Sequence, residues 1–152
     1  MIEPGAKAPD FTLRDHGGKE RSLSDFGGRK LVLAFYPGDF SPVCSDQLSV
    51  YQEVLGEIES RGAQLVGVSV DSTWSHRAFR KQLNLEMPLL SDFHPKGEMS
   101  SAYGAYLPDW GTTNRSLVLV GEDGVVRWSH AEETPGTIPG ANLIFDALEN
   151  AD

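Results

Sequence analysis

The sequence contains very little cysteine. Cys44 is the single cysteine among 152 residues, so a disulfide within the chain is impossible. A zinc site built from several thiolates is excluded for the same reason. A lone cysteine is most often a small buried apolar side chain, and only its surroundings can favour a reactive one.

Basic residues are also scarce, with 13 Lys and Arg against 22 Asp and Glu and a formal net charge of −9. This balance argues against nucleic acid and anionic membranes as partners, because both are bound through basic patches. No run approaches the roughly 18 consecutive apolar residues of a membrane-spanning helix. The N-terminus lacks a basic segment followed by an apolar run, so we expect no secretory signal and a cytoplasmic location.

Metal-binding motifs are absent from the sequence. The four histidines, His16, His76, His94 and His130, show none of the short spacings found among metal ligands. We therefore expect neither a metal nor an organic cofactor.

The apolar pattern that is present predicts a strand, a helix and a second strand. Residues 31–36 form a continuous apolar run, typical of a strand buried on both faces. From Cys44 to Ile58 apolar residues recur in steps of 4, 3, 4 and 3, which marks one helical face, and Gly62 is a good helix stop. Residues 65–70 form a second buried run. This order predicts a βαβ unit with parallel strands.

Shorter elements are predicted on either side of this unit. Residues 11–13 and 21–23 flank a turn and predict an N-terminal β-hairpin, and residues 116–120 and 125–128 predict another. We also expect a turn or short helical segment at 24–28, helices at 74–84, 96–105 and 140–149, a strand at 87–90 and a loop at 107–114. The prediction is a single α/β domain over residues 1–152, with a central mixed β-sheet flanked by helices as in thioredoxin-like proteins.

Cys44 falls in the first turn of the predicted helix. Ser41 followed by Pro42 is typical of a helix start, with Ser as the N-cap and Pro at the first helical position. Free backbone N–H groups and the positive end of the helix dipole favour a thiolate in that turn. The spacing therefore predicts an activated thiolate. The alternative is a cysteine that only packs against the preceding strand.

Several segments resemble the peroxiredoxin family. Pro37, Ser41 and Cys44 match the family pattern Pro-x-x-x-Thr/Ser-x-x-Cys, and the whole stretch 35–44 is similar to the family's active-site segment. Further segments resemble the family in the same order: residues 69–76, Tyr103-Gly104 with Arg115, and residues 121–127. The likeness extends over residues 4–150, nearly the whole chain.

The resemblance implies a thiol-dependent peroxidase that reduces hydrogen peroxide and organic hydroperoxides. Cys44 would attack a peroxide oxygen and become a sulfenic acid. Arg115 would stabilise the thiolate and donate hydrogen bonds to the peroxide. The Ser41 hydroxyl would contact both groups, Pro37 would shield the thiolate from water, and the backbone N–H groups of Val43 and Cys44 would be further donors.

Each of these residues also has a structural interpretation. Ser41 can be only a helix cap, Pro37 only a strand terminator, and Arg115 a surface ion-pair residue. Gln47 lies one turn after Cys44, at a position where relatives often carry Glu, and it either orients Arg115 or is an exposed helix residue. His76, Trp74 and Trp110 could border the site, although packing in the core or at an interface is the favoured interpretation.

A second, resolving cysteine is missing. Ser49 occupies the position, five residues after Cys44, where the bacterioferritin comigratory branch often carries it. We therefore expect a one-Cys enzyme whose sulfenic acid is reduced by an external thiol, either a low-molecular-weight thiol or a thioredoxin- or glutaredoxin-type protein. The short chain resembles that branch or the alkyl hydroperoxide reductase E type, and we expect a homodimer.

Two other functions remain as alternatives. The first is a non-catalytic redox sensor or binding module that keeps the same fold and Cys44. The second is a different cysteine enzyme, but a Cys-x5-Arg phosphatase would need arginine at the position of Val50. A hydrolase would need a histidine placed to accept the thiol proton, and only His76 is a candidate.

Overall fold

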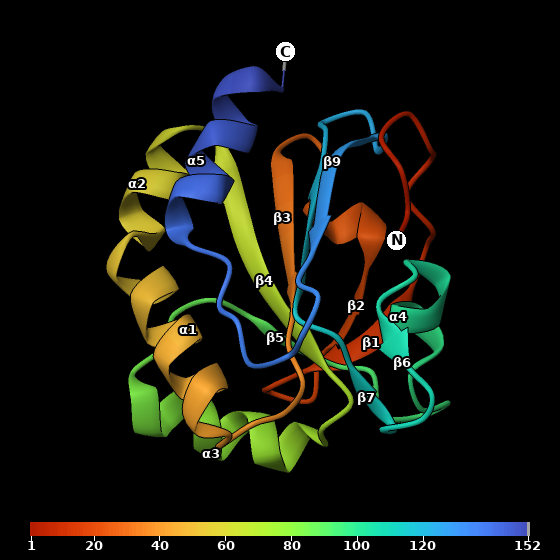
Figure 1. The fold of residues 1–152 in the computed structure, drawn as a ribbon, viewed down its shortest axis with the longest axis vertical. Helices are drawn as coiled ribbons and strands as arrows, with labels where there is room; N and C mark the ends of the chain where they lie inside the picture. Colours follow the sequence, from red (N-terminus) through yellow and green to blue (C-terminus); the bar gives the residue numbers. More distant parts are fainter. Residues whose placement is uncertain (152) are drawn as a thin grey trace.

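The computed structural model describes residues 1–151, which form a seven-stranded sheet with helices on both of its faces (Figure 1). The strand order is β2-β1-β5-β4-β3-β8-β9. These strands are β1 (Thr12–Asp15), β2 (Glu20–Ser22), β3 (Lys30–Phe35), β4 (Ala63–Ser69), β5 (Leu89–Ser91), β8 (Ser116–Val120) and β9 (Val126–Ala131). Strands β6 (Tyr106–Leu107) and β7 (Thr112–Thr113) pair separately.

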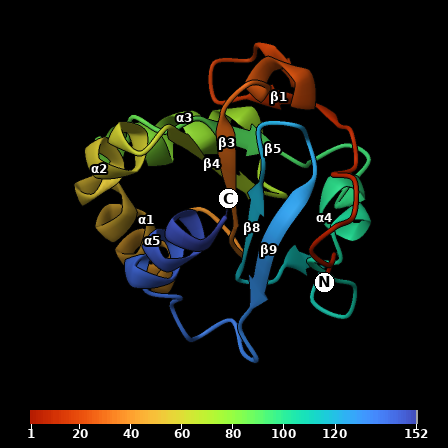
Figure 2. The ribbon, with the colours of Figure 1, turned by 90° about the horizontal axis from the view of Figure 1, so that it is seen from above.

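Within residues 1–151, five α-helices and one 3₁₀ turn accompany the strands. They are η1 (Leu23–Phe26), α1 (Pro42–Glu53), α2 (Leu55–Ser60), α3 (Thr73–Leu83), α4 (Glu98–Ala102) and α5 (Ala141–Asn150). Helices α1, α2 and α5 lie together on one side of the sheet and α4 lies on the other, as the view in Figure 2 shows. Among the described residues no helix is long and apolar enough to cross a membrane.

The continuous apolar run of β3 is explained by its central position. Successive side chains of a strand point to opposite faces, so both faces of β3 need apolar residues when both are covered. Val32 and Ala34 pack with α1, α2, α3 and α5, whereas Leu31, Leu33 and Phe35 pack with the N-terminal segment, η1 and α4. The predicted mixed sheet, flanking helices and N-terminal hairpin are therefore confirmed.

The pairing of β3 also determines what lies beside the start of α1. β3 runs parallel to β4 and antiparallel to β8, and Phe35 at its carboxyl end is paired with Ser116 at the start of β8. The residue before Ser116 is Arg115. The sheet register therefore places Arg115 next to the loop that leads from β3 to α1.

Predicted and observed boundaries differ by one to three residues at several elements. The predicted helix from Cys44 to Ile58 is divided into α1 and α2, because the Val54 N–H bonds to the carbonyl of Tyr51 three residues back and tightens the turn. The strand predicted at 87–90 begins only at Leu89, since Pro88 has no N–H for a strand ladder. The helix predicted at 96–105 is limited to α4.

The predicted loop at 107–114 was wrong in one respect. It contains β7, which pairs with β6 through Tyr106 and Thr113. A two-residue strand is too short to show alternation in the sequence, so its pairing gave no pattern to detect.

Candidate active site

Cys44 lies in the first turn of α1, directly after the loop that follows β3. Ser41 is the N-cap of the helix, and its Oγ accepts a hydrogen bond from the Cys44 N–H at 3.2 Å. Pro42 occupies the first helical position, where its missing N–H costs nothing. The helix start predicted from Ser41 and Pro42 is therefore present. Cys44 itself has no exposed surface.

Arg115 is the cation beside the sulfur. Its Nη1 donates to Cys44 Sγ at 3.3 Å and to Gln47 Oε1 at 2.5 Å, and its Nε donates to the Pro135 carbonyl at 2.8 Å. Only 1% of Arg115 is exposed, so the interpretation as a surface ion-pair residue is wrong. A buried guanidinium and a helix N-terminus both favour negative charge at Sγ.

Gln47 is fully buried and links Arg115 to a chain of hydrogen bonds, so its interpretation as an exposed helix residue is wrong. Its Nε2 donates to the Tyr51 hydroxyl at 3.1 Å, and that hydroxyl donates to the Pro139 carbonyl at 2.6 Å. Burial raises the pKa of Tyr51 to about 12, so the hydroxyl keeps its proton at neutral pH. Because the Gln47 amide is neutral, it orients the guanidinium without cancelling its charge.

The remaining predicted site residues lie on the approach to the helix. Pro37 is half-buried in the loop after β3, and Val43 is half-buried at the second helical position. The backbone N–H of Val43 is among the first N–H groups of the helix, which have no partner within the helix. The Ser41 hydroxyl makes its hydrogen bond to the Cys44 N–H, and no described contact joins it to Sγ.

Sequence reasoning missed four contributors to this site. The Thr113 hydroxyl donates to the carbonyl of Tyr36, which fixes the junction between β3 and the loop. Tyr51 was interpreted only as part of the apolar face of the helix. The carbonyls of Pro135 and Pro139 are backbone groups, for which the residue type gives no signal.

The three residues that could have bordered the site lie elsewhere. Trp74 is 75% exposed and Trp110 is 69% exposed, so packing of either in the core is wrong. His76 is buried, but its two ring nitrogens bond to Asp39 and to the Leu90 carbonyl rather than to Cys44. His76, Asp39 and Asp71 bring potential metal-ligand atoms within 4.8 Å of one another.

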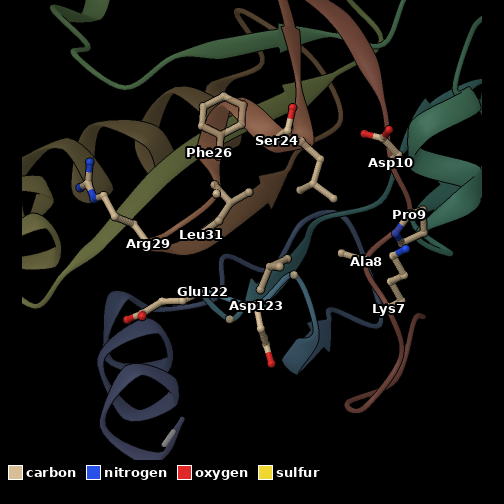
Figure 3. A pocket seen from close by; sticks show the side chains of 15 residues that line it. Lys7, Ala8, Pro9, Asp10, Ser24, Phe26, Arg29, Leu31, Glu122 and Asp123 are labelled. Carbon is tan, nitrogen blue, oxygen red and sulfur yellow. The ribbon is translucent and has the colours of Figure 1, made fainter.

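A hollow of about 570 Å³ lies at the amino end of β3 (Figure 3). Its wall includes Leu31 near the start of β3, whereas the loop to Cys44 follows Phe35 at the carboxyl end. At about 3.3 Å per residue, a strand separates these two positions by more than 10 Å. Lys7, Arg29 and Asp123 lie around this hollow, but no cysteine does, so it is not the place of thiol chemistry.

Comparisons with known proteins all point to one family. Residues 4–129 match the AhpC/TSA family. The chain is 34% identical over 149 residues to alkyl hydroperoxide reductase E of Mycobacterium tuberculosis, covering 97% of each protein. It is 35% identical over 128 residues to chloroplastic peroxiredoxin Q of Oryza sativa subsp. japonica, covering 84% of this chain and 58% of that protein.

Solved structures agree with this result. The AhpC crystal structure from Enterococcus faecalis superposes with a TM-score of 0.90 at 25% identity and covers 98% of this chain and 92% of that one. The peroxidoxin BcpB structure from Mycobacterium tuberculosis gives 0.85 at 25% identity, with 98% and 96% covered.

Proposed function

Because the chain belongs to the AhpC/TSA family of peroxiredoxins and is a thiol-dependent peroxidase, we propose that Cys44 is its reacting thiol and that an external thiol restores it. The observation that carries this assignment is the hydrogen bond from the buried Arg115 guanidinium to Sγ at 3.3 Å. A fixed cation at that distance stabilises the thiolate and then the negative charge that passes to the departing oxygen.

The reaction begins with the Cys44 thiolate and a hydroperoxide. The sulfur forms a bond to the terminal peroxide oxygen as the O–O bond breaks, so the sulfur is oxidised by two electrons and the peroxide is reduced. The products are a sulfenic acid on Cys44 and, after the leaving oxygen takes a proton, water or an alcohol.

We assign the neighbouring residues to this step by their geometry. Arg115 stabilises the thiolate and the charge that develops on the departing oxygen, and Gln47 keeps the guanidinium oriented. Ser41 caps α1 and thereby fixes the Cys44 amide. The Val43 N–H is a further donor toward the peroxide, and Pro37 limits the access of water from the loop side.

The return step needs two thiols from outside the chain, since Cys44 is the single cysteine. The first thiol attacks the sulfenic sulfur and releases water, which leaves a mixed disulfide. The second thiol displaces Cys44 as a thiolate, and the reductant leaves as a disulfide.

A cytoplasmic setting, where thiols are kept reduced, fits the need for an external thiol. The exposed Trp74 and Trp110 offer apolar surface for the proposed homodimer.

Rapid mixing of the reduced protein with hydrogen peroxide or an organic hydroperoxide tests the proposal. We expect a second-order rate constant several orders of magnitude above that of free cysteine, with one oxygen added at Cys44 in the mass spectrum. Cys44→Ser is the control that removes the reaction. Turnover with dithiothreitol, and its absence with Cys44→Ser, tests the return step.

A rate constant equal to that of free cysteine would refute the peroxide chemistry at Cys44. The chain would then be a non-catalytic redox sensor or binding module on the same fold, and partner capture would replace turnover as the measurement.

A further inference from the structure

The loop between β3 and α1 contains a strained residue. Phe40, immediately before the helix cap Ser41, has a φ of 66°, in the left-handed region that bulky side chains avoid. Such a backbone conformation is strained and persists only where the surroundings hold it. The Phe40 ring is half-exposed and packs edge-on against Phe79, with 5.2 Å between the ring centres.

The stronger restraint on this loop is made by the preceding residue, Asp39. Its backbone N–H donates to Asp71 Oδ2 at 2.8 Å, and its Oδ1 accepts a hydrogen bond from the Tyr36 hydroxyl at 2.6 Å. Its Oδ2 accepts from the Ser75 hydroxyl at 2.8 Å and lies 2.8 Å from His76 Nδ1. The side chains of Asp39 and His76 have no exposed surface, so water does not compete for these bonds.

His76 is itself fixed on its far side. Its Nε2 lies 2.9 Å from the carbonyl of Leu90 in β5, and a carbonyl can only accept, so Nε2 carries a hydrogen. This bond orients the ring so that Nδ1 faces Asp39. Burial and the neighbouring Asp39 raise the pKa of Tyr36 well above its usual value, so its hydroxyl also remains a donor.

The two carboxylates of this cluster accept hydrogen bonds from protein donors. Asp71 Oδ2 accepts from the Asp39 N–H and from the Ser69 hydroxyl, and both Asp39 oxygens are occupied by protein donors. Carboxylate oxygens that accept these bonds act as structural anchors. The cluster therefore ties the loop to β4, β5 and α3.

We propose that Asp39 and His76 are positioning residues of the peroxidase reaction, which hold the loop at 37–40 so that Cys44 stays beside Arg115. The inference rests on the proposed function of Cys44. Neither residue touches the sulfur. They act through the strained Phe40 and the cap Ser41, two consecutive residues that determine where α1 begins.

Two variants of His76 distinguish the positioning role from a role in core packing. His76→Asn keeps an amide N–H near the position of Nδ1, facing Asp39, and loses the bond to the Leu90 carbonyl. His76→Gln keeps a donor near Nε2 and loses the bond to Asp39. Both remove the ring from the core, so loss of packing affects them alike.

We expect His76→Gln to lower the second-order rate constant with hydrogen peroxide about 10- to 100-fold, because small displacements of a reacting group have effects of this size. His76→Asn should retain the rate within about threefold, since it keeps a donor to Asp39 and loses only the bond to the Leu90 carbonyl. Equal losses in the two variants, or no loss in either, would overturn the proposal. Urea unfolding of each variant shows that the fold is kept.

The rate of Cys44 alkylation by iodoacetamide tests the loop without any peroxide. Because the sulfur has no exposed surface, a released loop should make alkylation faster in His76→Gln than in His76→Asn. Opposite changes in the two rates, slower oxidation and faster alkylation, are the expected signature. An unchanged alkylation rate in His76→Gln would contradict the restraint.

The outcomes distinguish failure of the proposed function from failure of the positioning role. If the wild-type protein reacts with peroxide no faster than free cysteine, the proposed function fails. The alkylation rates then test on their own whether His76 restrains the loop. If the wild type is fast and His76→Gln is equally fast, only the positioning role fails. Should His76→Gln not fold, Tyr36→Phe removes one donor to Asp39 without changing the ring, and a rate within error of wild type would then refute the role.

Discussion

The two ends of β3 differ in what they offer to chemistry. The amino end borders a hollow of about 570 Å³, and the carboxyl end leads to a sulfur with no exposed surface. Only the second end combines a nucleophile, a buried cation and a helix N-terminus within hydrogen-bond distance. Open volume therefore does not locate the reaction in this fold, whereas converging polar groups do.

The comparison is tested most strongly by removing an arginine from each end. Arg115→Ala should lower the rate constant with hydrogen peroxide about 10²- to 10³-fold, because a preorganised charge partner of the reacting atoms is lost. Arg29→Ala, at the hollow, removes a hydrogen bond to the Ala63 carbonyl and should leave the rate unchanged. Stopped-flow kinetics measures both, and similar losses in the two variants would mean that Arg115 acts only on stability.

Alkaline pH should lower the free energy of unfolding through Tyr51, which lies at the Cys44 end of β3. The folded-state pKa of Tyr51 is raised from 10 to about 12, so its contribution to the free energy of unfolding is complete below pH 10 and is lost as pH rises to 12. A shift of this size corresponds to about 3 kcal/mol. Tyr51→Phe should therefore flatten the decline of the urea midpoint between pH 10 and 12. An equal slope in wild type and variant would show that Tyr51 does not titrate there.

A smaller effect is expected from the residue that orients Arg115. Gln47→Ala removes an acceptor of the guanidinium and a donor to Tyr51, and we expect about a tenfold loss of rate, which is about 1.4 kcal/mol. Ser24→Ala at the hollow is the matched control and should not alter the rate. If Gln47→Ala reacts like wild type, the buried amide has no part in orienting Arg115.

The smallest effects should come from charged side chains around the hollow. Lys7→Ala and Glu122→Ala replace exposed residues and should change the free energy of unfolding by less than about 0.5 kcal/mol. Urea unfolding and the peroxide rate are the measurements. A loss of peroxide rate in either variant would mean that this end of β3 communicates with Cys44.

Much of the fold could be predicted because its signals are local. The apolar run of β3, the helical face that begins at Cys44 and the turn residues of both hairpins are each contained in a short stretch of sequence. The cap formed by Ser41 is of the same kind, since it depends on neighbours three residues away. The break at Val54 could not be predicted, because the apolar period continues through it.

The site was less predictable because its contacts join distant segments. Arg115 meets Cys44 through the pairing of Phe35 with Ser116, a register that no local pattern shows. In the sequence alone, the placement of Arg115 beside Cys44 depends on the family resemblance. The bond between Asp39 and His76 spans 37 residues, and neither residue has a local pattern that points to the other.

The complete burial of Cys44 has a consequence for the timing of the catalytic cycle. A peroxide needs only a small displacement of the surrounding groups to reach this sulfur, whereas a reductant must bring its own sulfur into line with the sulfur of Cys44 and needs a larger one. The first turn of α1 must therefore open before each reduction, and this opening is a unimolecular step. Turnover should consequently level off at high reductant concentration, at a ceiling set by how often the helix opens rather than by how tightly the reductant binds.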